Sequence, residues 1–85
     1  MQNDSQHPRY IRIAIDVAKR IIDNKLIENQ KIKGRSVLAA EYSVSPETIR
    51  RAMALLSEME VVEILPNSGI IIKSKEKAIN FTNKF

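Results

Sequence analysis

The feature that most constrains this chain is a well-marked helix start at Ser45, separated by only a short turn from the helical segment before it. Ser45 can accept a hydrogen bond from a free backbone N–H, Pro46 suits the first helical position, and Glu47 favours the positive end of the helix dipole. Beyond them, apolar residues recur at helical spacing to about Met59, which predicts a helix with one buried face: Ile49, Ala52, Met53, Leu56 and Met59. The chain must therefore fold around two helices joined by a tight turn.

The N-terminal region predicts another amphipathic helix, beginning at Pro8 and continuing to about Leu26. Its core-facing stripe is expected to be Ile11, Ala14, Ile15, Ala18 and Ile22. A second apolar band lies beside that stripe, formed by Tyr10, Ile13, Val17 and Ile21. We expect this band, together with Phe81 and Phe85, to leave apolar surface for dimerisation and the chain itself to be a monomer or weak dimer.

Between these helices, a short extended segment around Ile32 is followed by Ser36, the expected N-cap of a helix "SVLAAEY". That helix can bury Val37 or Leu38, with Ala39 and Tyr42. The β-branched runs "VVEIL" and "GIIIK", joined by "PNSG", predict a two-stranded hairpin in which Gly69 is a turn residue. Residues 75–85 regain helical character.

Composition narrows the possible functions. A chain of 85 residues allows one compact domain, and its net charge of +4 permits an anionic partner. With no cysteine and a single histidine, His7, in a polar stretch, we expect no metal, no cofactor, no catalytic set and therefore no enzyme. The chain has neither a long apolar run nor a signal-peptide pattern, so we expect no membrane contact and a cytoplasmic location.

Three helices followed by a hairpin, with a tight turn before the third helix, is the order of a winged helix-turn-helix, a mainly α fold with a small β-hairpin. The segments "YIRIAIDVAKRII", "GRSVLAAEYSVSPETIRRAMALL" and "VVEILPNSGIIIK" resemble the GntR family of bacterial transcription regulators. "GRS", "VSPETIRRA" and "IIIKSKEKA" are closer to a subgroup, including repressors of betaine uptake, whose DNA-binding domain precedes a coiled coil and a TrkA-C module that senses cyclic di-AMP.

The resemblance implies a sequence-specific DNA-binding domain, with the helix of about Pro46–Met59 in the major groove and a wing, Asn67–Gly69, on the minor groove or backbone. We expect a disordered tail at 1–7, the DNA-binding domain at 8–74, and at 75–85 the start of a linker helix. The linker would lead to a C-terminal region that dimerises and binds cyclic di-AMP or another metabolite, which implies a palindromic operator of double-stranded DNA and a homodimer or higher oligomer.

Three residues match DNA contacts of the family, mostly to phosphate: Ser45, Thr48 and Arg50. Gly69 matches the family's wing glycine. Many members carry an arginine where this chain has Pro46, and the familiar loop arginine is displaced here to Arg35. The full set of expected DNA-binding residues is Arg35, Ser36, Ser45, Pro46, Glu47, Thr48, Arg50, Arg51, Asn67, Ser68 and Gly69.

Physical chemistry supports this reading, because a capped helix start suits a phosphate and an arginine can bind guanine through two hydrogen bonds. We expect Arg51 to read a base and Arg50 to bind phosphate. Two roles remain open for Glu47: accepting a hydrogen bond from a cytosine amino group, or pairing with Arg51 four residues later. The alternative function is a winged-helix protein–protein interaction module, which would usually expose an apolar patch.

Overall fold

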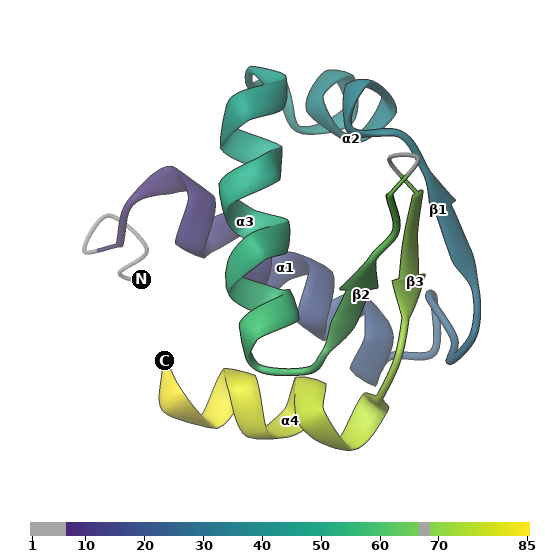
Figure 1. Cartoon of the computed structure of the whole chain (residues 1–85). Helices are drawn as coiled ribbons and strands as arrows, with labels where there is room; N and C mark the ends of the chain where they lie inside the picture. The colour runs from purple at the N-terminus through teal and green to yellow at the C-terminus, as the bar shows by residue number, and fades with distance from the viewer. Residues whose placement is uncertain (1–6, 67–68) are drawn as a thin grey trace.

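A computed structural model of the chain describes residues 7–66 and 69–85 (Figure 1). Its elements follow the order α1 (Arg9–Ile22), β1 (Lys31–Lys33), α2 (Arg35–Tyr42), α3 (Pro46–Glu58), β2 (Val62–Ile64), β3 (Gly69–Ile72) and α4 (Lys75–Lys84). The mainly helical winged helix-turn-helix is confirmed. The sheet has three strands, because β1 pairs antiparallel with β3, which in turn pairs with β2. The prediction of a two-stranded hairpin was therefore incomplete.

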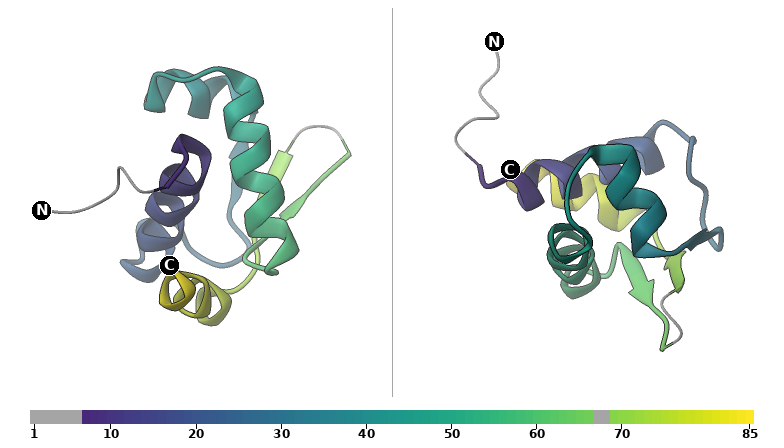
Figure 2. Two further views of the ribbon diagram at one scale, coloured as in Figure 1. Left: turned by 90° about the vertical axis from the view of Figure 1, so that its left-hand side faces the viewer. Right: turned by 90° about the horizontal axis from the view of Figure 1, so that it is seen from above.

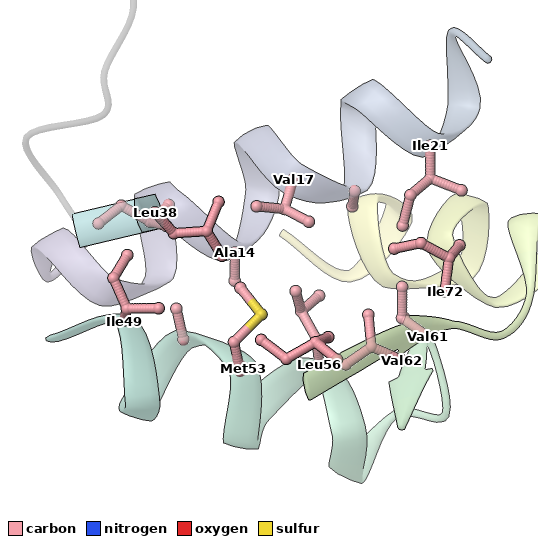
Figure 3. Close-up of a cluster of buried hydrophobic side chains, with 14 of the residues drawn as sticks. Ala14, Val17, Ile21, Leu38, Ile49, Met53, Leu56, Val61, Val62 and Ile72 are labelled. Atoms are coloured by element: carbon pink, nitrogen blue, oxygen red, sulfur yellow. The ribbon is translucent and has the colours of Figure 1, made fainter. Parts of the chain in front are cut away.

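Helix α1 lies at the centre of the domain and packs against both α3 and α4. Figure 3 shows Met53 and Leu56 of α3 pointing towards Ala14 and Val17 of α1. The rest of the core comes from the sheet, α2 and α4, and its fully buried large side chains include Val61, Val62, Ile70, Ile72 and Phe81.

Our expectation of a spare apolar band on α1 was wrong. Ile13, Val17 and Ile21 are 5%, 1% and 1% exposed, whereas Ile11 and Ile15 of the expected core stripe are only half-buried. The reason is that α1 packs against both α3 and α4 (Figure 2), so it buries a wider apolar face than contact with one helix requires.

Helix α4 is the helix expected at the C-terminal end of the chain, and it packs onto the domain. Ser74 caps it by accepting a hydrogen bond from the Lys77 N–H, at 3.0 Å. Phe81, expected to be available for dimerisation, is fully buried, while Phe85 is 45% exposed. The Phe85 ring meets the edge of the His7 ring at 5.8 Å between centroids, so His7 packs against the domain; residues 1–6 of the expected tail lie outside the described residues.

The start of α2 differs from the prediction. Gly34, not Ser36, occupies the N-cap position, without a capping side chain. Its φ of 64° is in the left-handed region, which favours glycine and lets the chain turn directly from β1 into the helix. Ser36 therefore lies inside α2, which buries Leu38 and Ala39 and leaves Val37 62% exposed.

A polar cluster joins α1 to α2. The Tyr42 hydroxyl donates to Asp16 Oδ2 at 2.6 Å, and Arg20 Nη1 donates to Glu41 Oε2 at 3.0 Å. The Arg20 guanidinium also lies 5.2 Å from the centroid of the Tyr42 ring. Burial, and then the hydrogen bond to Asp16, raise the pKa of Tyr42 well above its usual value, so the donor stays protonated. This cluster fixes the position of α2 and hence of the turn into α3.

Candidate nucleic-acid interface

The start of α3 is built as the sequence predicts. Ser45 has extended backbone angles, Pro46 holds the first helical position, and Glu47 is the acidic residue of the first turn. Ser45 Oγ accepts a hydrogen bond from the Thr48 N–H at 3.3 Å, and the two hydroxyl oxygens are 3.2 Å apart. The cap therefore leaves two hydroxyl groups beside the positive end of the helix, a suitable environment for an anion.

The exposed face of α3 is a ridge with an arginine on each side. At 100° per residue, Glu47, Ala54 and Glu58 follow the outermost line of the helix. Arg50 lies about 60° to one side of Glu47 and Arg51 about 40° to the other. The surroundings agree, since Arg50 lines a recess with Met53 and Ile64 on the sheet side, whereas Arg51 lies over the ring of Tyr10 in α1.

Arg50 forms a double hydrogen bond with Glu47. Arg50 Nε donates to Oε1 at 2.9 Å and Nη2 to Oε2 at 2.5 Å. The hydrogen bond from Arg50 and the positive charges of Arg50, Arg51 and Arg35 lower the pKa of Glu47, so its carboxylate stays ionised at neutral pH. Of the two roles left open for Glu47, pairing with Arg51 is not formed: Glu47 pairs with Arg50, three residues on, and the Arg51 guanidinium is turned towards α1.

Residues at the start of α2 complete the face on the sheet side. A hollow of about 310 Å³ lies between the starts of α2 and α3 and brings together expected residues from both: it is lined by Gly34, Arg35, Ser36, Pro46, Glu47 and Arg50. Next to it, Ile64 and Ile70 form an apolar recess bordered by Arg35 and Arg50. Sequence reasoning missed Ile64, which is 40% exposed; its place two residues after buried Val62, on the same side of β2, is the signal that could have found it.

Gly69 is not the turn residue we expected. It is the buried first residue of β3, paired with Lys33 of β1, and its carbonyl oxygen accepts a hydrogen bond from the Leu65 N–H at 2.8 Å. A Cβ here would lie 2.7 Å from Lys31 Cε and 3.3 Å from Leu65 Cδ1. A side chain here would thus displace the end of the Lys31 side chain and press on Leu65. Asn67 and Ser68, the other expected wing contacts, lie outside the described residues.

No helix among residues 7–66 and 69–85 has the length and apolar character that a bilayer span needs. The same residues contain no group of three or more acidic, histidine or cysteine side chains arranged to hold a metal ion.

Comparison with known proteins gives consistent matches over the same elements. Residues 9–72 match the family model described as "Bacterial regulatory proteins, gntR family". The gluconate operon transcriptional repressor of Bacillus licheniformis is 35% identical over 69 residues, which are 81% of this chain and 28% of the repressor. The chain thus spans less than a third of that relative.

Solved structures show the same arrangement bound to DNA. BusR of S. agalactiae, in complex with its busAB-promotor DNA, superposes with a TM-score of 0.86 and 38% identity over 92% of this chain and 38% of BusR. A second BusR complex, with busA-promotor DNA, gives a TM-score of 0.77 and 40% identity over 85% of this chain and 36% of the other.

Proposed function

The chain belongs to the GntR family of bacterial regulatory proteins, and we propose that it is the sequence-specific DNA-binding part of a transcription regulator. The observation that carries the proposal is the start of α3, where a capped and exposed helix end is surrounded by Arg35, Arg50 and Arg51. Proteins bind phosphates through the free backbone N–H groups at a helix start, through hydroxyl groups and through guanidinium groups. The BusR complexes support the proposal, since a similar domain is there bound to promoter DNA.

In the proposed complex, α3 enters the major groove with its N-terminal turns towards the base edges. Arg35 and Ser36 of α2 lie beside this end of α3 and contact the DNA backbone. The wing at 67–69 contacts the minor groove or backbone. The alternative, a protein–protein interaction module, has less support because Arg35, Glu47 and Arg50 line the hollow on this face.

For the whole regulator we propose a repressor in the cytoplasm that binds a palindromic operator as a dimer or higher oligomer. The gluconate operon repressor supports repression. Dimerisation and the effector site, for cyclic di-AMP or another metabolite, are assigned to sequence outside these 85 residues, because the chain matches only 28% and 38% of the longer relatives. Sedimentation of the 85-residue chain is accordingly expected to show a monomer or weak dimer.

Binding to a random-sequence duplex at several salt concentrations tests the proposal. Phosphate contacts make the affinity fall steeply with salt. In a plot of log association constant against log salt concentration, each contact adds about 0.9 to the downward slope. Arg50→Ala should lower that slope by about one. Lys84→Ala removes the same charge from α4, at the opposite end of α3 from the capped start (Figure 1), and should leave the slope unchanged. Salt-independent binding, or equal slopes for the two variants, would contradict the proposal.

A further inference from the structure

Tyr10 is the aromatic residue that meets Arg51. It is the second residue of α1, half-buried and packed against the hydrophobic core. The Arg51 guanidinium carbon lies 4.5 Å from the centroid of its ring. A guanidinium group is attracted to the face of a tyrosine ring at this distance. Because the ring is held by the core, it provides a fixed support for a side chain that would otherwise be free in solvent.

The contact turns Arg51 away from the outermost line of α3 and towards α1. A helix in the major groove presents its outermost line to the base edges, whereas its two flanks face the two DNA backbones. Arg51 also lines a hollow of about 300 Å³, together with Pro8, Arg9, Tyr10 and Thr48. Its lining includes two arginines and two hydroxyl side chains and no acidic residue. A neighbouring hollow of about 260 Å³ takes in Tyr10 and Arg51 as well, together with Arg50 and the acidic Glu58.

We propose that Tyr10 is a positioning residue whose ring holds Arg51 on the α1 side of α3, where the guanidinium binds a backbone phosphate. This inference rests on the proposed DNA-binding function and replaces our expectation that Arg51 reads a base. Arg50 and Arg51 then bind the two opposite backbones of the groove, and the outermost line with Glu47 faces the bases.

The test measures binding of a random-sequence duplex over a series of salt concentrations, using the 85-residue chain and four variants: Arg51→Ala, Tyr10→Leu, Tyr10→Phe and the double variant Tyr10→Leu/Arg51→Ala. Arg51→Ala should lower the salt slope by about 0.9, the value for one phosphate. Tyr10→Leu should weaken binding about two- to fivefold, the size of an exposed cation–π contact. Tyr10→Phe keeps the ring face and should bind as the parent does.

The double variant separates positioning from a merely structural role. If Tyr10 acts through Arg51, Tyr10→Leu causes no further weakening once Arg51 is alanine. Equal weakening in both backgrounds would overturn the inference, as would a Tyr10→Phe variant as weak as Tyr10→Leu, which would indicate a contact made by the hydroxyl.

If Arg51 instead contacts a base, the sequence that the protein selects will change when Arg51 is removed. Selection from a random duplex pool should give the same preferred sequence for Arg51→Ala as for the parent, whereas loss of preference at one base pair would overturn the inference. If the parent binds with a steep salt dependence and Arg51→Ala keeps its full slope, only this inference fails. If the parent itself shows no salt-dependent binding, the proposed function fails with it.

Discussion

At the scale of single residues, two adjacent arginines of α3 have different partners. Arg50 is held by the Glu47 carboxylate, whereas Arg51 lies over the Tyr10 ring. The charge of Arg50 is therefore partly neutralised in the free protein, whereas no carboxylate among residues 7–66 and 69–85 forms an ion pair with Arg51. A phosphate must compete with Glu47 for Arg50, so Glu47 is expected to restrain binding to arbitrary DNA.

Glu47→Gln tests this restraint with a side chain of the same shape. We expect the variant to bind a random-sequence duplex more tightly than the parent, because Arg50 is released and a carboxylate no longer repels phosphate. If Glu47 also accepts a hydrogen bond from a cytosine amino group, preference at one base pair should fall about tenfold. Titration of the random duplex and selection from a random pool measure the two effects.

Glu58→Gln is the matched control, since Glu58 lies on the same outermost line about three turns further along α3. It removes the same charge at a distance from the capped end. If Glu47→Gln binds the random duplex no more tightly than Glu58→Gln does, the restraint does not exist.

The helix start at this site could be predicted from the sequence, but the side-chain partners of Glu47 and Arg51 could not. The Ser45 cap and the outward position of Glu47 depend on neighbours within one turn and were predicted correctly. The choice of Glu47 between Arg50 and Arg51 depends on Tyr10, which is about forty residues away in sequence and reaches α3 only through the packing of α1.

At the scale of elements, three helices end in the same way without a glycine. Asn24, Ser43 and Glu60 have φ values of 65°, 57° and 64° just after α1, α2 and α3. After α2, the Ser43 N–H donates to the Ala40 carbonyl at 3.2 Å and the Val44 N–H to the Ala39 carbonyl at 2.9 Å, the pattern of a Schellman motif. The left-handed conformation is strained for residues with a Cβ, so these three positions lower the free energy of unfolding.

Ser43→Gly should therefore stabilise the protein. Relief of the left-handed strain, less the extra entropy that glycine has in the unfolded chain, gives a gain of about 0.5–1 kcal/mol in the free energy of unfolding. The control is Ala40→Gly, an exposed position inside α2, which should lose about 0.5–1 kcal/mol. Thermal unfolding of both variants measures the difference, and a lower midpoint for Ser43→Gly than for the parent would contradict the account.

Helix α4 depends on a single buried ring. Phe81 is fully buried, and Phe85 packs on it with ring centroids 4.8 Å apart. Phe81→Ala should lower the free energy of unfolding by about 3–5 kcal/mol, a large part of the roughly 5–15 kcal/mol of a small domain. Phe85→Ala, at a 45% exposed site, should cost about 1 kcal/mol. Urea unfolding compares the two, and equal losses would show that α4 does not pack as described.

The sequence did not predict which elements pack against each other, and α4 is one example. The periodicity of residues 9–22 revealed two apolar bands on α1, but periodicity cannot say which later element covers a band. The pairing of β1 with β3 was missed for the same reason, since Lys31–Lys33 is a three-residue strand with one apolar side chain and finds its partner almost forty residues later.

At the scale of the whole molecule, the proposed DNA-binding residues gather at one end of α3, and α4 lies towards the other end (Figure 1). The starts of α2 and α3 share one hollow, and Ile64 of β2 and Ile70 of β3 line the recess next to it. Sequence reasoning located this face because its residues fall in three short motifs of one known fold. The sequence did not predict that Tyr10 of α1 borders this face through its contact with Arg51.

The central claim is that the first turns of α3 meet the DNA. Titrating the ¹⁵N-labelled protein with a duplex and following its backbone amide signals tests that claim most directly. The account predicts the largest chemical-shift changes at Ser45 and residues 47–51, with further changes at 35–36 and Gly69, and little change in α4 or in residues 23–30. Changes concentrated in α4 or residues 23–30, with Ser45 and residues 47–51 unaffected, would contradict it.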